Sequence, residues 1–188
     1  MRTVLLGPPG AGKGTQAARL AQRWEIPAIS TGDIFRANVQ GKSELGRKAQ
    51  EYMNAGALVP DEVTNAMVRD RLGQDDLDRG FLLDGYPRNP DQAVELESML
   101  SDLGVELDVA IEITADSDAV TARLLKRAEI EGREDDTEPV IRKRLEVYAL
   151  QTAPVSAYYE GRGLLVQIDG LGEIDEVTER IVAAAESR

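Results

Sequence analysis

The sequence contains neither cysteine nor histidine, and aromatic residues make up only 4% of its 188 residues. Without cysteine the chain has no disulfide framework and no thiolate metal ligand. Without histidine it has no imidazole base or imidazole ligand. Any chemistry in this protein must therefore use carboxylates, lysine, arginine and backbone groups.

Long hydrophobic runs and an excess of positive charge are also missing. No apolar run approaches the roughly 20 residues of a membrane span, and the N-terminus leads into a glycine-rich loop in place of a cleavable apolar segment. We therefore expect a cytoplasmic protein without membrane contact. The net charge of −12 argues against a nucleic-acid partner, which would require a basic stripe. A chain of 188 residues suits one α/β domain with inserts.

The stretch 7–15 reads GPPGAGKGT, and it follows an apolar run at residues 4–6. A strand, a glycine-rich turn and a helix in this order are typical of a phosphate-binding loop, because the glycines let backbone N–H groups surround an anion at a helix N-terminus. Lys13 would reach the outer phosphates. Gly14 separates Lys13 from Thr15, so we do not expect the loop to ligate Mg²⁺ directly. The alternative is a glycine-rich connection without a ligand.

Residues 30–59 predict a small flap on the main domain. The short apolar segment 26–29 could be a buried edge strand of a parallel sheet. It ends at a helix-capping sequence, and Gly41, Gly46 and Gly56 are expected to break the following helices. This stretch has too few large apolar residues for a core of its own. A helix with Pro60 in its first turn then begins the next part of the main domain.

An all-apolar strand at residues 80–83 is followed by Asp84 and, four residues later, Arg88. Ligands of open parallel sheets bind beyond the carboxyl ends of the strands, so both residues are expected beside the phosphate loop. Asp84 could hold Mg²⁺ through water, and Arg88 could bind a phosphate bidentately. Alternatively, Asp84 caps the helix that begins near Pro90.

Further strands are predicted at 107–113 and 164–170, with helices at 118–128, 138–150, from 152 onward and at 174–186. Strands that alternate with helices predict a parallel three-layer α/β fold with five strands. The polar stretch 129–137 is expected to be a loop or lid. A cluster of basic residues suggests a small anionic ligand in a cleft, or a solvated helix face with i,i+4 pairs. The cluster comprises Arg123, Lys126, Arg127, Arg133, Arg142, Lys143 and Arg144.

Nearly the whole chain resembles the adenylate kinases of the short-lid type, which are nucleoside monophosphate kinases. Several motifs occur in the family's order: the phosphate loop, STGD at 30–33 with Arg36, GALVPD at 56–61, LDGYPR at 83–88, Gln92, Arg123 with Arg127, GREDD at 132–136 and RKR at 142–144. The resemblance implies a P-loop NTPase-type sandwich in one domain of 1–188. Its core would be 1–29, 60–125 and 137–188, with an AMP-binding flap at 30–59 and a short lid at 126–136.

The resemblance also implies site residues. ATP would lie against Gly10, Ala11, Gly12, Lys13, Gly14, Thr15, Arg123, Arg127 and Gly172. AMP would lie against Thr31, Arg36, Ala57, Leu58, Val59, Gly85, Tyr86, Pro87, Arg88, Gln92, Arg133 and Arg144. The catalytic set would be Lys13, Asp84, Arg88, Arg133 and Arg144.

The implied reaction is ATP + AMP ⇌ 2 ADP with Mg²⁺, in a monomer and without zinc, since the long lid that binds zinc in some members is missing. A uridylate or cytidylate kinase is the nearest alternative, but Thr31 and Gln92 favour adenine because a side-chain amide can read its edge. A shikimate- or gluconate-type kinase would lack the arginines for a second nucleotide. A module that senses AMP and ATP without turnover also stays open, although Lys13 and the arginines exceed what sensing requires.

Overall fold

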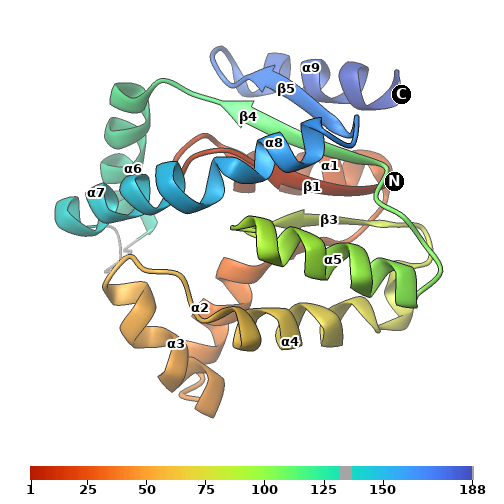
Figure 1. The fold of residues 1–188 in the computed structure, drawn as a ribbon. Coiled ribbons are helices and arrows are strands. Elements are labelled where there is room, and N and C mark those ends of the chain that lie inside the picture. The colour runs from red at the N-terminus through yellow and green to blue at the C-terminus, as the bar shows by residue number, and fades with distance from the viewer. Residues whose placement is uncertain (132–136, 188) are drawn as a thin grey trace.

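A computed structural model describes residues 1–131 and 137–187, with only the backbone at 117–119, 127–129 and 131. Five strands form one sheet in the order β2-β3-β1-β4-β5 (Figure 1). They are β1 (Arg2–Leu6), β2 (Ala28–Ser30), β3 (Phe81–Asp84), β4 (Val109–Thr114) and β5 (Leu165–Asp169). Every pair of neighbouring strands is parallel. The predicted α/β class with a five-stranded parallel sheet is confirmed.

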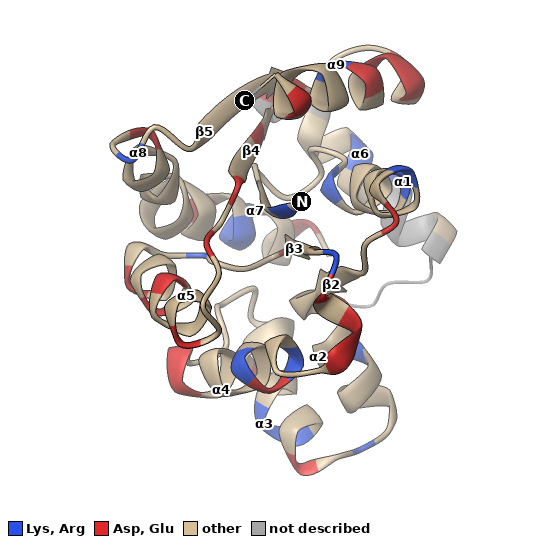
Figure 2. Cartoon of the chain, turned by 90° about the vertical axis from the view of Figure 1, so that its right-hand side faces the viewer, with Lys and Arg blue, Asp and Glu red and all other residues tan. Residues whose placement is uncertain are grey.

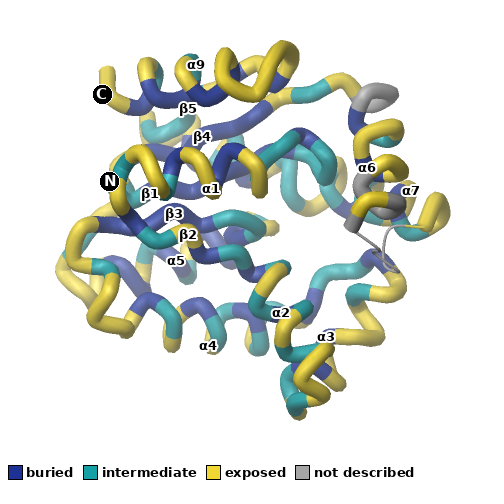
Figure 3. Tube along the Cα trace, turned by 180° about the vertical axis from the view of Figure 1, so that it is seen from behind, coloured by how far each residue is buried: buried dark blue, intermediate teal, exposed yellow. Residues whose placement is uncertain are grey.

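Alternate side chains of the strands enter two different cores, as a pleated strand requires. Val4 and Leu6 of β1 pack against α4 (Asp61–Leu72), α5 (Pro90–Asp102) and α8 (Pro154–Glu160), whereas Leu5 packs against α1 (Lys13–Trp24) and α9 (Ile174–Glu186). The central strands β1, β3 and β4 are thus buried on both faces, and the helices that cover them turn their exposed sides outward (Figure 3). This produces the predicted three layers.

The segment after β2 forms two helices, α2 (Thr31–Gln40) and α3 (Glu44–Asn54). The prediction that Gly46 breaks a helix is wrong, because Gly46 lies inside α3. A Cβ at this position would lie 2.1 Å from the Asn38 carbonyl oxygen. Glycine is therefore needed there because α2 and α3 approach each other too closely for any side chain.

A small apolar cluster joins these two helices to the main domain. Phe35, Ala49 and Val59 are buried, and Val63 and Met67 of α4 pack against them. The expectation that residues 30–59 lack a complete core of their own is consistent with this arrangement, because α4 supplies part of the cluster.

The chain between β4 and β5 forms α6 (Ser117–Glu131), α7 (Glu138–Val147), a π-helical turn η2 (Tyr148–Thr152) and α8. The predicted helix to residue 150 was too long, because the α-helical pattern stops at Val147. At the π-helical turn that follows, the Ala153 N–H donates a hydrogen bond of 2.8 Å to the Tyr148 carbonyl oxygen, five residues earlier. Of the predicted lid, residues 126–131 belong to α6, and 132–136 lie outside the described residues.

Charged side chains lie mainly on the helices and loops around the sheet (Figure 2). Within residues 1–131 and 137–187, no helix combines the length and the apolar composition that crossing a membrane would require. The short 3₁₀ turn η1 (Asp75–Leu77) connects α4 toward β3.

Candidate nucleotide site

The phosphate loop between β1 and α1 depends on glycine for its shape. The φ angles of Gly7, Gly10 and Gly12 are 135°, 83° and 94°, values that residues with a side chain rarely adopt. A Cβ on Gly7 would lie 2.4 Å from the Ile113 carbonyl oxygen, and one on Gly10 would lie 2.9 Å from the Leu124 side chain. The loop is therefore pressed against β4 on one side and α6 on the other. Helix α1 has no acidic residue in its first turn, which keeps its N-terminus suitable for an anion.

Lys13, the first residue of α1, folds back over this loop. Its Nζ donates hydrogen bonds to the carbonyl oxygens of Gly7 at 2.7 Å and Pro8 at 2.9 Å. The ammonium group is thus held at the mouth of the loop, where a phosphate would lie.

Asp84 ends β3 directly beside the loop, as the argument from strand ends predicted. In the sheet register it pairs with Leu5 of β1 and with Ser30 of β2. A Cβ on Gly14 would lie 3.8 Å from Asp84 Oδ2, so the carboxylate faces the first turn of α1.

Gly85 connects this strand end to the residues that follow. Its φ is 82°, and its carbonyl oxygen accepts hydrogen bonds from Thr31 Oγ1 at 2.9 Å and from Arg88 Nε at 2.8 Å. A Cβ would lie 2.8 Å from Thr31 Oγ1. Tyr86 is fully buried, donates its hydroxyl to Asn65 Oδ1 at 2.8 Å and precedes a cis peptide bond to Pro87.

The Arg88 backbone is fixed from both sides. Its N–H donates to Gln92 Oε1 at 2.7 Å, and its carbonyl oxygen accepts from Thr152 Oγ1 at 2.8 Å. Sequence reasoning did not single out Thr152, because nothing in the sequence indicates that η2 reaches this loop.

Arg88 lies within electrostatic reach of Asp84 and of two arginines from other elements, Arg36 of α2 and Arg144 of α7. Arg88 keeps exposed surface but is densely surrounded by protein, and this desolvation lowers the pKa of its guanidinium. Asp84 raises that pKa, whereas Arg144 and Arg36 lower it further. Arg36 also forms an ion pair with Asp33. The cluster is an excess of positive charge that anionic groups would relieve.

Thr31 and Gln92 are almost completely buried, with exposed fractions of 2% and 1%. Both side chains already form hydrogen bonds within the protein. Thr31 Oγ1 donates to the Gly85 carbonyl oxygen, and Gln92 Nε2 donates to Asp61 Oδ1 at 2.7 Å. Nothing in the sequence indicates the hydrogen bond to Asp61. A base could use only the second N–H and the second lone pair of the Gln92 amide.

The loop after β5 also lies against the phosphate loop. A Cβ on Gly170 would lie 2.7 Å from the Thr114 carbonyl oxygen and 3.5 Å from that of Ala11. Gly172, in the same loop, has φ of 117°. Arg123 is exposed on α6, where Arg127 also lies, and Arg133 is outside the described residues.

The predicted acceptor residues Ala57, Leu58 and Val59 follow α3. Just before them, a Cβ on Gly56 would lie 3.0 Å from the Val140 carbonyl oxygen, so this segment meets the first turn of α7. The structure therefore brings the end of the α2–α3 segment to the helix that carries Arg144.

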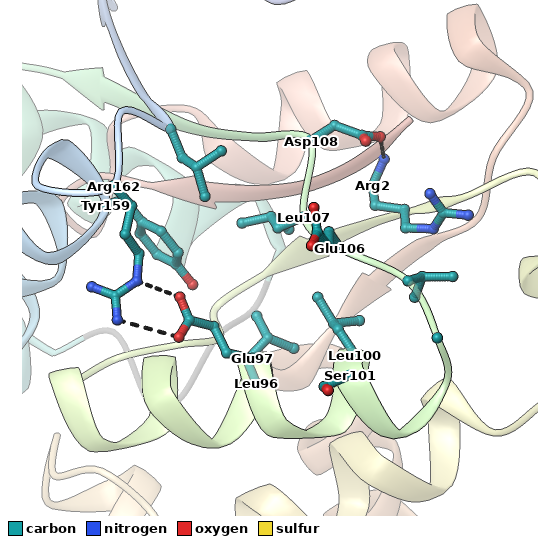
Figure 4. Close-up of a pocket in the computed structure, with 13 residues that line it drawn as sticks. Arg2, Leu96, Glu97, Leu100, Ser101, Glu106, Leu107, Asp108, Tyr159 and Arg162 are labelled. Carbon is teal, nitrogen blue, oxygen red and sulfur yellow. Dashed lines mark hydrogen bonds and ion pairs between the residues drawn. The ribbon is translucent and has the colours of Figure 1, made fainter.

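A separate cavity of about 920 Å³ lies at the amino ends of the strands, away from the phosphate loop (Figure 4). Its rim includes Arg2 and Asp108, and an Arg162–Glu97 ion pair lies beside the apolar residues Leu96 and Leu107. None of the predicted site residues lines it.

In the part of the chain that is described, no three acidic side chains gather as a metal cage.

Comparison with known proteins identifies the family. A family model described as adenylate kinase matches residues 5–164. The adenylate kinase of Kocuria rhizophila is 62% identical over 185 residues, covering 98% of this chain and 98% of that protein. The adenylate kinase of Thermobifida fusca is 61% identical over 188 residues, covering 100% of both. That of Bifidobacterium longum is 50% identical over 186 residues, covering 99% of this chain and 100% of that protein. With this identity and coverage, the chain belongs to the adenylate kinase family.

Proposed function

We propose that the protein catalyses reversible phosphoryl transfer between ATP and AMP, giving two molecules of ADP. The observation that carries the proposal is the grouping of Arg36 and Arg144 around Arg88, in the segment that follows Asp84 beside the phosphate loop. A loop with one lysine suffices to bind one nucleotide, whereas three further cations suit a second phosphate group close to the first.

The donor and acceptor occupy opposite sides of this cluster in our proposal. ATP lies against the phosphate loop and the neighbouring α6 and β5 loop, with contacts from Gly10, Ala11, Gly12, Lys13, Gly14, Thr15, Arg123, Arg127 and Gly172. AMP lies against α2, the segment after α3 and the loop after β3, with contacts from Thr31, Arg36, Ala57, Leu58, Val59, Gly85, Tyr86, Pro87, Arg88, Gln92, Arg133 and Arg144. The packing of Gly10 on α6 and of Gly170 on the phosphate loop supports the first set.

The chemistry requires little beyond positioning and charge. Nucleophile and leaving group are both phosphate oxygens, so no general base is needed, in agreement with a chain that has no histidine. Lys13 balances charge that develops on the transferring group. Arg88, Arg133 and Arg144 grip it with planar guanidinium groups that remain charged when water is excluded.

The residues beside the loop fit a magnesium ion that arrives with ATP. Asp84 Oδ2 faces Gly14, which brings no hydroxyl ligand, so we propose that Asp84 holds the ion through water. When bound, the ion would offset part of the negative charge of the phosphate groups. No zinc is proposed for a chain without cysteine or histidine.

We further propose that residues 30–59 act as a flap and 126–136 as a short lid on a core of 1–29, 60–125 and 137–188. Two movable segments that complete the site only with both substrates bound would keep water from the phosphoryl group. We propose a cytoplasmic monomer without a nucleic-acid or membrane partner. The net charge of −12 supports the absence of a nucleic-acid partner.

The test is incubation of the purified protein with ADP and Mg²⁺ alone. We expect AMP and ATP to appear in equal amounts, and Lys13→Met to abolish their formation while the circular dichroism spectrum stays unchanged. A panel of nucleoside monophosphates with ATP should then show AMP as the preferred acceptor. If ATP and AMP bind but ADP is never converted, the protein is a nucleotide sensor and the proposed function is wrong.

A further inference from the structure

The Asp61 carboxylate, at the start of α4, receives N–H groups from two side-chain amides. Gln92 Nε2 donates to Asp61 Oδ1 at 2.7 Å. Asn89 Nδ2 donates to Oδ1 at 3.1 Å and to Oδ2 at 3.0 Å. An ionised carboxylate accepts hydrogen bonds and donates none, so only the NH₂ end of each amide can face it.

The opposite ends of both amides face backbone donors. Asn89 Oδ1 accepts the Gln92 N–H at 2.8 Å as the cap of α5, and Gln92 Oε1 accepts the Arg88 N–H at 2.7 Å. A reversed Gln92 amide would set N–H against N–H at Arg88 and oxygen against carboxylate at Asp61. Since Gln92 is 1% exposed, water has little access to relieve either conflict. The network therefore has one arrangement of hydrogens that satisfies all its members.

We propose that Asp61 is a positioning residue that locks the orientation of the Gln92 amide and thereby sets which purine the acceptor site takes. The inference rests on the proposed function, in which Gln92 lies at the acceptor base. The pairing edge of adenine carries an acceptor at N1 and an amino donor at N6. Hypoxanthine, the base of inosine monophosphate (IMP), has nearly the same size but the reverse pattern, a donor at N1 and a carbonyl at C6. A Gln92 amide held in one orientation can form hydrogen bonds with one of these two bases and leaves the pairing groups of the other base without partners.

The first variant is Asp61→Asn, which keeps the shape but adds an N–H donor. Whichever way the new amide turns, it conflicts with Asn89 or forces Gln92 against the Arg88 N–H. The two orientations of Gln92 then become close in energy. We expect the ratio of kcat/KM for AMP over IMP to fall by about tenfold, with KM for ATP unchanged.

The reciprocal exchange, Asp61→Asn with Asn89→Asp, provides a rescue. It moves the carboxylate across the same contact, so the amide at 61 donates to position 89 and turns its oxygen to Gln92 Nε2. The exchanged carboxylate can still cap α5. We expect discrimination to return to the wild-type value. Glu62→Gln is the matched control, because it removes an exposed charge from the next residue of α4 and should leave the ratio unchanged.

Steady-state kinetics with AMP, IMP and ATP, together with thermal unfolding, decide the matter. A loss of discrimination in Asp61→Asn that the exchange restores supports the inference. Unchanged discrimination in Asp61→Asn, or equal losses toward ATP and AMP, overturns it. If the single variant does not fold, the exchange carries the test alone, and a folded exchange variant without discrimination overturns the inference. A wild type that does not phosphorylate AMP would instead overturn the proposed function.

Discussion

Thr152 Oγ1 donates a hydrogen bond to the Arg88 carbonyl oxygen at 2.8 Å, between residues 64 positions apart in the chain. Thr152 closes the π-helical turn that follows α7, and α7 carries Arg144. One continuous segment thus supplies one arginine of the site and holds the backbone of another. This explains how cations that repel each other can be kept in a fixed arrangement.

Removing this bond should loosen Arg88. Thr152→Val keeps the side-chain shape but leaves the Arg88 carbonyl without its partner, at a cost of about 1 kcal/mol. We expect kcat to fall by roughly tenfold, with a Tm lowered by about 2–4 °C. Thr152→Ser retains the hydroxyl and should stay near the wild type in both kinetics and calorimetry. Wild-type kcat in the valine variant would show that Gln92 alone suffices to hold Arg88.

Lys13 should be essential for turnover but not for folding. Its ammonium group donates hydrogen bonds to two backbone oxygens of its own loop, at 2.7 and 2.9 Å. In Lys13→Met we expect kcat to fall by at least about 100-fold, because the charge on the transferring group is no longer balanced. Lys48→Met, which removes an exposed lysine paired with Glu44 on α3, is the matched control and should be fully active. Near-normal turnover in Lys13→Met would refute the role of Lys13.

The contact of α2 with α3 makes a prediction about stability. Gly46→Ala would place a methyl group 2.1 Å from the Asn38 carbonyl oxygen, so the helices must separate. We expect a loss of about 1–3 kcal/mol in the free energy of unfolding, as for other overpacked sites. Gly73→Ala is the control, because the nearest atom to its Cβ would be 3.6 Å away. Urea unfolding measures both, and equal stabilities would contradict the close approach.

The main features of the fold could be predicted because they depend on local patterns. Short apolar runs indicated all five strands, and the rule that ligands lie beyond strand ends located Asp84 beside the phosphate loop. Capping residues and proline indicated several helix starts, among them α2 after Ser30 and α4 after Pro60. The suggested capping of the helix near Pro90 by Asp84 was wrong, because Asn89 caps α5.

Features that depend on contacts between distant segments could not be predicted. Gly46 looked like a helix breaker, because nothing in its surroundings shows that Asn38 packs on it. Asp61 and Thr152 looked like ordinary helix-end residues, since their partners are 28 or more positions away in the chain. Most of the network around Gln92 and Arg88 is of this kind.

Buried tyrosines should make the protein sensitive to alkali. Burial raises the pKa of Tyr86, Tyr148 and Tyr159 above 10.0, and at Tyr148 the nearby Glu112 adds to the effect. Above pH 10.0 these tyrosines lose their protons in the unfolded chain but keep them in the folded protein. The free energy of unfolding is therefore highest below that pH and falls as the pH rises toward the pKa values of the folded protein. Urea titrations on both sides of that pH should show a steep decline, and Tyr148→Phe should make it shallower. A stability that is constant across this range would contradict the prediction.

The arginine cluster predicts that closure around substrates is driven by phosphate charge. Without ligand, Arg88 lies near two other cations, Arg36 and Arg144, and near the Asp84 carboxylate, while Arg36 also pairs with Asp33. Two bound nucleotides would bring several negative charges among them. An analogue with two adenosines joined by five phosphates should therefore bind far more tightly than AMP or ATP. Because partly exposed charges are screened over a Debye length of about 8 Å at physiological salt, its affinity should fall as the ionic strength rises.

Two arginines of α7 separate this effect from general surface charge. Arg144 is half-buried and faces the cluster, whereas Arg142 is exposed and pairs with Glu138 on the same helix. Arg144→Ala should remove much of the analogue's advantage and reduce the salt dependence, and Arg142→Ala should change neither. Arg133→Ala is expected to act like Arg144→Ala. Calorimetric dissociation constants at low and high salt measure each variant. Equal affinities for the wild type and Arg144→Ala, with no dependence on salt, would show that these cations are only solvated surface and that closure has another cause.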